Sequence, residues 1–457
     1  MIFNDFRFLF VFLPAIVIAC YFLVPATRRR DLLLAASLLY YSFSGIEHTI
    51  ILVAGVVWVY AICRSDAIKD NGWRLTVAVI GPAAALVYYK YWTFILNSAW
   101  QFSDAGATRP FSIFENVILP AGISFFTFQM ISFAIDRYRG NIREMPPFRS
   151  FALYISFFPQ LVAGPILRFD HVKGAIDNLS RFAPSRKDFA DAMAYIVFGL
   201  MVKVLLADSL SRIMTPIITD PGALSIGGGA YVVLGYSFQI YFDFYGYSLI
   251  AIGLGRLFGF RFPDNFLRPY EANNPRDFWR RWHVSLSYWI RDYLYLPLGG
   301  NRRYALNIAI VFGACGLWHG AGWNFVVWGL YHGILVAGYS AVAPWWDRLP
   351  TLLQRTLNFT LVSLGWLLFL FDFAAAKALF LSLLGQGTGL VAAPNFWNWI
   401  ILLTAAAICF GANFERSVGR DCSRRGIGIA YGIVLGAIFF LTMLFIDISQ
   451  TFIYFRF

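Results

Sequence analysis

The stretch GACGLWHGAGWNF, residues 313–325, places one ionisable side chain inside a long apolar run. His319 lies between Trp318 and Gly320, and the nearby small residues let neighbouring helices approach closely. Because desolvating a polar group costs free energy, an ionisable residue in such a segment is by default a functional candidate. The alternative is an interhelical hydrogen bond worth about 1 kcal/mol. This stretch alone does not distinguish catalysis from packing.

The composition around this stretch is that of a membrane protein. Hydrophobic residues make up 59% of the 457 residues and charged residues 14%, against about 25% charged residues in a typical soluble domain. A soluble chain of this length has too much water-facing surface for such a composition. We therefore predict an all-α polytopic membrane protein forming a single domain, 1–457, with about eleven transmembrane helices plus helices that enter the bilayer partway.

Apolar segments recur along the whole chain. They cover approximately 6–25, 32–46, 49–63, 75–101, 118–137, 148–166, 188–207, 226–259, 305–319, 321–343, 355–373, 376–412 and 426–447. The first of them indicates a retained anchor rather than a cleaved signal, since the start of the chain offers only Arg7 as a basic residue. We expect the longest segments to bend or to contain two pieces.

The net charge of +12 resides mainly in short loops between apolar segments. Lys and Arg in such loops mark the cytoplasmic side of a membrane, so no nucleic-acid partner is expected. The arginines of ATRRRD (26–31) predict an amino terminus outside the cytoplasm, and 63–74 and 416–425 are further cytoplasmic candidates. Five cysteines without CxxC spacing favour neither a disulfide framework nor a metal site.

One polar region, 260–304, leads directly to the apolar run that ends at His319. It contains eight Arg against four acidic residues. Within it, RDFWRRWHVSLSYWIRDYLYLPLGGNRR (276–303) alternates Arg, Trp and Tyr as an interfacial helix does. Interfacial anchoring explains most of the arginines, but it does not explain His283, which lies between Trp282 and an apolar stripe.

The other histidines and one cysteine have simpler interpretations. We expect His48 and His171 to be solvated and His332 to be a polar residue that holds packed helices together. Cys315 lies one helical turn before His319. A thiol–imidazole pair would permit an acyl-enzyme, but a small packing residue is the favoured interpretation.

Several long motifs resemble the membrane-bound O-acyltransferase (MBOAT) superfamily, and within it the bacterial branch that acetylates exported polysaccharides. They are ILPAGISFFTFQMISFAIDRYRG (118–140), FFPQLVAGPILR (157–168), YFDFYGYSLIAIGLGRLFGF (241–260), FWRRWHVSLSYWIRDYLYLPLGGNR (278–302) and GLWHGAGWNFVVWGLYHG (316–333). The resemblance is clear over about 110–340. Family members carry an essential histidine in the WHG element, which falls on His319. This branch has a second histidine upstream, which falls on His283.

The resemblance implies a ring of helices around a central tunnel in which the two histidines meet near mid-membrane. It also implies an enzyme that transfers an acetyl group from a cytoplasmic thioester donor, acetyl-CoA, toward hydroxyls of an exported polysaccharide such as alginate. No bound cofactor and no metal are expected. The implied location is the bacterial inner membrane, and the implied partners are periplasmic acetyltransferases.

Transfer from a thioester to a hydroxyl needs a base for the hydroxyl proton and stabilisation of the oxyanion. An imidazole suits the base role because its unperturbed pKa lies near neutrality. We assign this role to His319, and to His283 the task of polarising the carbonyl or orienting His319. Arg280 and Arg281 are candidate ligands for the donor phosphates, although interfacial anchoring explains them equally well.

Three alternatives remain open at this point. The transferred group could be D-alanine, moved from a carrier-protein thioester to teichoic acid. The chain could be a non-catalytic transporter of an acyl group or lipid, although its polar residues concentrate in 260–332 rather than in several spans. It could also be a scaffold that anchors an extracytoplasmic acetyltransferase.

Overall fold

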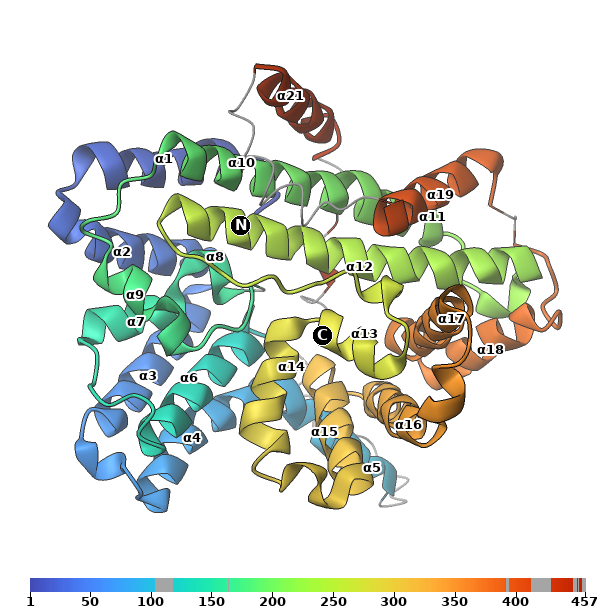
Figure 1. Ribbon diagram of the computed structural model, residues 1–457, viewed down its shortest axis with the longest axis horizontal. Coiled ribbons are helices and arrows are strands. Elements are labelled where there is room, and N and C mark those ends of the chain that lie inside the picture. Colours follow the sequence, from blue (N-terminus) through green and yellow to red (C-terminus); the bar gives the residue numbers. More distant parts are fainter. Residues whose placement is uncertain are drawn as a thin grey trace. The chain divides into compact units, whose positions relative to one another are not determined.

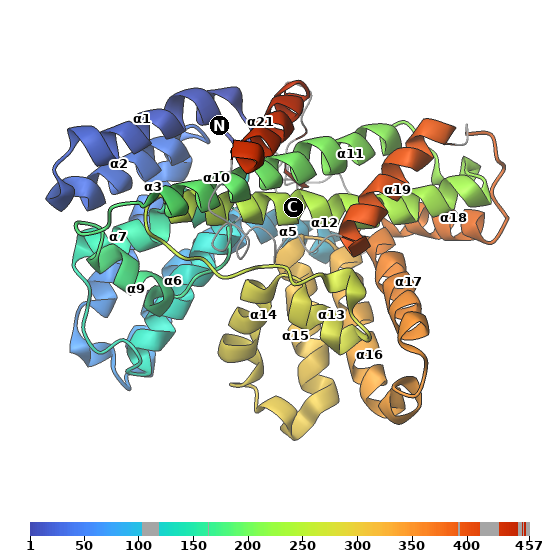
Figure 2. The same ribbon diagram turned by 45° about the horizontal axis from the view of Figure 1, so that its top comes forward.

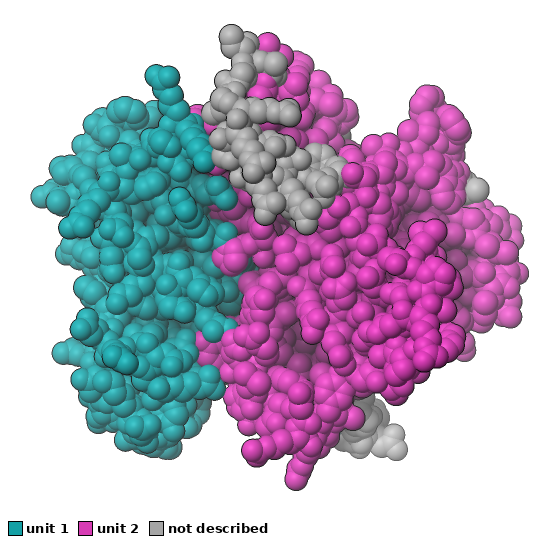
Figure 3. All heavy atoms as spheres, viewed as in Figure 1, with its two compact units in different colours: residues 1–188, 254–262 teal, residues 189–253, 263–457 magenta. Residues whose placement is uncertain are grey.

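The computed structural model describes residues 1–102, 118–162, 164–391, 394–411, 429–446, 450 and 452–453. The regular elements of this described part are helices. They form two compact units, 1–188 with 254–262 and 189–253 with 263–457, which Figure 3 colours separately. The predicted loop 416–425 lies outside the described residues.

Unit 1 consists of short and medium helices. They are α1 (Leu13–Ile18), α2 (Arg29–Ser42), α3 (Ile46–Cys63), α4 (Gly72–Leu86), α5 (Trp92–Phe102), α6 (Ile123–Tyr138), α7 (Phe148–Ser156), α8 (Phe158–Leu161) and α9 (Phe169–Asp177). A π-helical turn over Val87–Tyr91 joins α4 to α5 without a break in the helical path.

Unit 2 contains the longest helices together with the short helices α11, α13 and α14. Its elements are α10 (Arg186–Met201), α11 (Asp208–Met214), α12 (Ile226–Leu257), α13 (Pro275–Arg281), α14 (Val284–Ile290), α15 (Tyr304–His319), α16 (Trp323–Trp346), α17 (Thr351–Leu370), α18 (Phe373–Leu383), α19 (Phe396–Gly411) and α21 (Ile429–Met443). The first three residues of α10 and the last four of α12 belong to unit 1.

Four helical segments in the described residues are long and apolar enough to cross a membrane. They are Ile46–Cys63, Gly72–Trp100, Arg186–Met214 and Trp323–Trp346. Shorter apolar helices cover Phe8–Leu23, Phe373–Leu383, Phe396–Gly411 and Tyr431–Met443. The all-helical prediction is confirmed for the described residues, whereas the predicted count of about eleven spans is not.

The prediction that His48 is solvated is wrong, because this residue lies on the buried face of α3. This side chain is 3% exposed rather than solvated. It begins a buried stripe that continues through Leu52, Val56, Val59 and Cys63, and residues at this spacing share one helix face. The stripe was not recognised because α3 is apolar on nearly every side, so its periodicity is weak.

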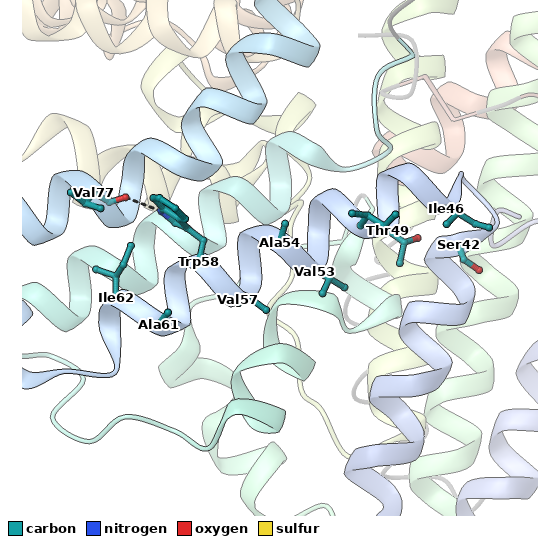
Figure 4. A pocket seen from close by; sticks show the side chains of 11 residues that line it. Ser42, Ile46, Thr49, Val53, Ala54, Val57, Trp58, Ala61, Ile62 and Val77 are labelled. Atoms are coloured by element: carbon teal, nitrogen blue, oxygen red, sulfur yellow. Dashed lines mark hydrogen bonds between the residues drawn. The ribbon is translucent and has the colours of Figure 1, made fainter.

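The opposite side of α3 carries an open apolar groove. Figure 4 shows its lining, mostly valine, isoleucine and alanine side chains, together with the Trp58 indole donating to the carbonyl of Val77 at 2.9 Å. Ser42 and Thr49 are the polar residues of this lining. The groove therefore offers a surface for hydrocarbon but no group suited to acyl transfer.

Close helix contacts in unit 2 depend on glycine. A Cβ at Gly316 of α15 would lie 2.1 Å from the carbonyl oxygen of Phe325, and one at Gly329 of α16 would lie 2.1 Å from that of Phe312. Such separations are far below van der Waals contact, so only glycine fits. Helices α15, α16 and α17 accordingly lie side by side, as both ribbon views show (Figures 1 and 2). This packing fixes the end of α15, where His319 lies.

Unit 2 also buries a charge cluster between the apolar span Arg186–Met214 and α12. The ammonium of Lys203 lies 2.5 Å from a carboxylate oxygen of Asp208 and 2.7 Å from one of Asp243. The other Asp243 oxygen accepts a hydrogen bond from the backbone of Ile453 at 2.7 Å. All three side chains are at most 4% exposed, and pairing offsets the cost of burying each charge.

Candidate active site

The polar stretch 276–303 does not form one interfacial helix, because the helix is interrupted at His283. Asn274 caps α13 by accepting from the backbone N–H of Asp277 at 2.8 Å, and Pro275 occupies the first helical position. At His283 φ is +44°, a left-handed conformation that ends α13 and starts α14 in a new direction. A non-glycine residue in this region stores strain, which is often found at functional sites.

The His283 side chain is completely buried within unit 2. Its ring packs edge-on against Phe244 of α12 at a centroid distance of 4.7 Å and lies 5.9 Å from the ring of Trp318. Its Nδ1 is 3.3 Å from Oδ1 of Asn265. His283 lies outside the four candidate spans, and desolvation lowers the pKa of its imidazole to about 3. Burial therefore favours the neutral form of the ring.

His319 is the last residue of α15 and is 2% exposed. Its ring is surrounded by aromatic groups: Trp318 and Trp328 at centroid distances of 5.0 Å and Phe369 at 5.5 Å. The indole of Trp318 thus contacts both predicted histidines. The structure brings together in one aromatic cluster two rings that are thirty-six residues apart in the sequence.

Unit 2 contains a cavity of about 500 Å³, which neither histidine lines but whose lining includes residues close to both of them in the sequence. Its lining residues come from α13, α14, the π-helical turn Arg291–Tyr295 that follows α14, α15 and α16: Arg276, Trp279, Arg280, Val284, Leu286, Ser287, Tyr288, Ile290, Arg291, Tyr295, Ile308, Val311, Phe312, Cys315 and Val336. Val284 directly follows His283. On α15 the lining stripe 308, 311, 312 and 315 has helical spacing, and its next position is His319. We call this space the α13–α16 cavity.

The structure separates the two predicted phosphate ligands. Arg280 lines the α13–α16 cavity, is exposed, and makes no ion pair with a described residue. Arg281 does not line the cavity. Its Nε donates to Asp277 at 2.8 Å, one helical turn earlier. Arg276 and Arg291 also line the cavity, and neither was singled out from the sequence.

The remaining histidines and Cys315 also have defined places. His171 is exposed on α9, in agreement with the prediction. His332 is fully buried, but its ring nitrogens have no hydrogen-bond partner among the described residues, so packing against Trp328 and Trp279 holds it. Cys315 is a buried free cysteine in the lining of the α13–α16 cavity.

Two buried polar features of unit 2 were not predicted from the sequence. No sequence pattern indicated a functional role for Asn265, since a lone Asn in a loop is ordinarily a turn residue. A pattern did indicate the buried cluster around Lys203, because a lysine within the apolar run 188–207 is an intramembrane ionisable group. Within the described residues, no group of three or more His, Cys, Asp or Glu side chains is arranged to hold a metal ion.

The chain belongs to the MBOAT, membrane-bound O-acyltransferase family, whose sequence profile matches residues 132–370. The chain is therefore a membrane-bound O-acyltransferase, and the resemblance of its motifs is confirmed.

Within this family, the chain is similar to acetyltransferases and to a D-alanyltransferase. The chain is 37% identical to the probable alginate O-acetylase AlgI of Azotobacter vinelandii, over 81% of this chain and 75% of the relative. It is 34% identical to the peptidoglycan O-acetyltransferase of Helicobacter pylori, over 81% and 77%. The teichoic acid D-alanyltransferase of Bacillus subtilis is 28% identical, over 70% of this chain and 82% of the relative.

Proposed function

We propose that this protein transfers an acetyl group from a cytoplasmic thioester donor, acetyl-CoA, toward hydroxyls of an exported polysaccharide such as alginate, at the bacterial inner membrane. The observation that carries the proposal is the placement of two buried histidines against one indole, in a unit that also contains a cavity with arginines in its lining. Acetyl transfer is favoured over D-alanyl transfer because the relatives named for acetylation are the more similar ones.

In the proposed reaction the hydroxyl oxygen attacks the thioester carbonyl carbon while His319 takes the hydroxyl proton. The tetrahedral intermediate then collapses. The C–S bond breaks, and the leaving thiolate takes the proton from His319, so the products are an oxygen ester and a free thiol. His283 polarises the carbonyl or orients His319. Base catalysis contributes about 10²–10⁴-fold, and alignment of donor and acceptor in a confined site contributes the orientation term.

The α13–α16 cavity is the proposed binding site for the donor. Most of its lining residues are apolar, which suits an acyl-pantetheine arm. Arg276, Arg280 and Arg291 supply positive charge for phosphate groups. Arg276 is already held by a hydrogen bond of 2.5 Å to Ser340, and Arg291 by one of 2.6 Å to Asp292. Arg280 is the guanidinium best placed to bind a phosphate without first breaking one of these hydrogen bonds.

Reconstitution into liposomes tests the proposed donor. Purified protein is supplied either with labelled acetyl-CoA or with a D-alanyl carrier protein, and the label released or transferred is measured. We expect turnover with acetyl-CoA. Turnover with the D-alanyl carrier protein but not with acetyl-CoA would show that D-alanine, not acetyl, is the transferred group. Absence of turnover with both donors, in folded protein supplied with a hydroxyl acceptor, would favour the scaffold or transporter alternatives. The periplasmic partners implied by the resemblance are proposed to receive the acetyl group after this step.

Replacing the arginines one at a time tests the donor site. Arg280→Ala is expected to raise the KM for acetyl-CoA about 10-fold, since a charge-assisted hydrogen bond contributes about 1.5–3 kcal/mol and less when it is exposed. Arg281→Ala is the matched control, because its guanidinium pairs with Asp277. Its expected effect is a stability loss of at most about 1 kcal/mol with an unchanged KM. Equal KM increases in both variants would contradict the assignment.

A further inference from the structure

We propose that Asn265 is a positioning residue that fixes the tautomer of His283 and makes its Nε2 a hydrogen-bond acceptor. This inference rests on the proposed function only in assigning His283 to the reaction. It adds a residue to the site and decides between the two roles that remain open for His283.

The orientation of the Asn265 amide follows from its neighbours. Asn265 is 1% exposed, and its Oδ1 lies 3.1 Å from the backbone nitrogen of Ser285 and 2.9 Å from the Ser285 hydroxyl. A backbone N–H can only donate, so the amide atom facing it must be the oxygen. The amide NH₂ group faces the other way and donates to the Ser248 hydroxyl at 3.4 Å.

This orientation determines which nitrogen of His283 carries the proton. Nδ1 of His283 lies 3.3 Å from the same Asn265 Oδ1. Because Oδ1 is an acceptor, the bond requires a proton on Nδ1. In a neutral imidazole the other nitrogen, Nε2, then carries the lone pair.

Asn265 and its neighbours also hold the strained backbone of His283. The backbone N–H of Val284 donates to the backbone carbonyl of Asn265 at 3.0 Å. The backbone N–H of Leu267 donates to the backbone carbonyl of Arg281 at 2.9 Å. The segment 265–267 is therefore bonded to the chain on both sides of His283. A left-handed conformation costs an L-residue about 1–2 kcal/mol, and these bonds offset that cost. One segment thus fixes both the backbone and the ring of His283.

A ring in this state has a defined chemical role. Polarising a carbonyl requires a hydrogen-bond donor, which a neutral imidazole protonated at Nδ1 does not offer at Nε2. Accepting a proton or a hydrogen bond from a hydroxyl or from the second imidazole requires the Nε2 lone pair. We therefore assign His283 to orienting His319 or the attacking hydroxyl.

Kinetics of two Asn265 variants test this proposal. Asn265→Leu removes the acceptor and is expected to lower kcat about 10–100-fold, as loss of a ring-orienting partner does elsewhere, with the donor KM unchanged within about 2-fold. Asn265→Asp keeps an acceptor oxygen and is expected to recover most of that kcat. Because a carboxylate stabilises the imidazolium, it raises the pKa of His283, so activity should fall on acidification at a higher pH than in the wild type.

The matched control is Asn358→Leu in α17. Asn358 is also fully buried, and it donates one hydrogen bond, to the Ala272 carbonyl at 3.1 Å. This variant also removes a buried amide and its hydrogen bond, but it is expected to keep the wild-type kcat. Asn265→Leu with the kcat of the control would overturn the proposal. If Asn265→Leu does not fold, the proposal is tested with Asn265→Asp alone. The proposal is overturned if the activity of Asn265→Asp falls on acidification at the same pH as that of the wild type.

A His283→Ala variant separates this inference from the proposed function. Full activity in folded His283→Ala protein would remove His283 from the reaction, and the proposed mechanism would fail. An inactive His283→Ala protein together with a fully active Asn265→Leu protein would leave the mechanism standing and reject only the positioning role.

Discussion

Replacing His319 with Ala is expected to lower the rate of acyl transfer by about 10²–10⁴-fold, the range that a positioned general base contributes. The side chain is buried among Trp318, Trp328 and Phe369, so water has little access to replace the lost base. Initial rates of acetyl release from acetyl-CoA, normalised to the amount of folded protein in liposomes, measure the effect.

The control for this variant is His171→Ala. His171 is exposed on α9 in unit 1, so its removal changes the histidine content without touching the aromatic cluster. We expect a wild-type rate. A His319→Ala protein that is well folded and retains more than about a tenth of the wild-type rate would exclude His319 as the base.

Replacing Gly316 with Ala is expected to cause the largest loss of stability. The added Cβ would lie 2.1 Å from the Phe325 carbonyl oxygen and 3.2 Å from the Cα of Gly329. These are backbone atoms, so relief requires α15 and α16 to separate. Overpacking of a close contact costs about 1–3 kcal/mol, occasionally more, and we expect the upper end of that range. Thermal unfolding in detergent, followed by tryptophan fluorescence, measures the change in Tm.

The same substitution is expected to reduce acyl transfer beyond what the stability loss explains. His319 lies three residues after Gly316 on the same helix, and a displacement of about 1 Å at a reacting group can cost about 10²-fold in rate. Gly313→Ala is the matched control on α15, because its added Cβ would lie 3.6 Å from Leu330, an ordinary contact. Equal Tm values and equal rates for the two variants would contradict the close-packing argument.

Most helices of this protein were predictable because an apolar run of sufficient length has few alternatives in a bilayer. The predicted segments 226–259, 305–319 and 321–343 correspond to α12, α15 and α16 within a few residues. The predicted segment 376–412 contains two pieces, α18 and α19, as expected for a run too long for one span. The number of membrane spans was less predictable, because length and hydropathy do not separate a spanning helix from a partly inserted one.

By itself the sequence determined the class of this protein and the identity of its two candidate histidines, because composition and motif order are properties of the chain. Its local pattern at 276–303 predicted an interfacial helix, and that prediction failed because His283 takes a left-handed conformation that no periodicity encodes. Only the tertiary structure placed both imidazoles against Trp318, gave Arg280 and Arg281 different surroundings, and brought Asn265 to Nδ1 of His283. The physical reason is that these contacts join residues distant along the chain, and close helix packing at glycines such as Gly316 and Gly329 decides which of them meet.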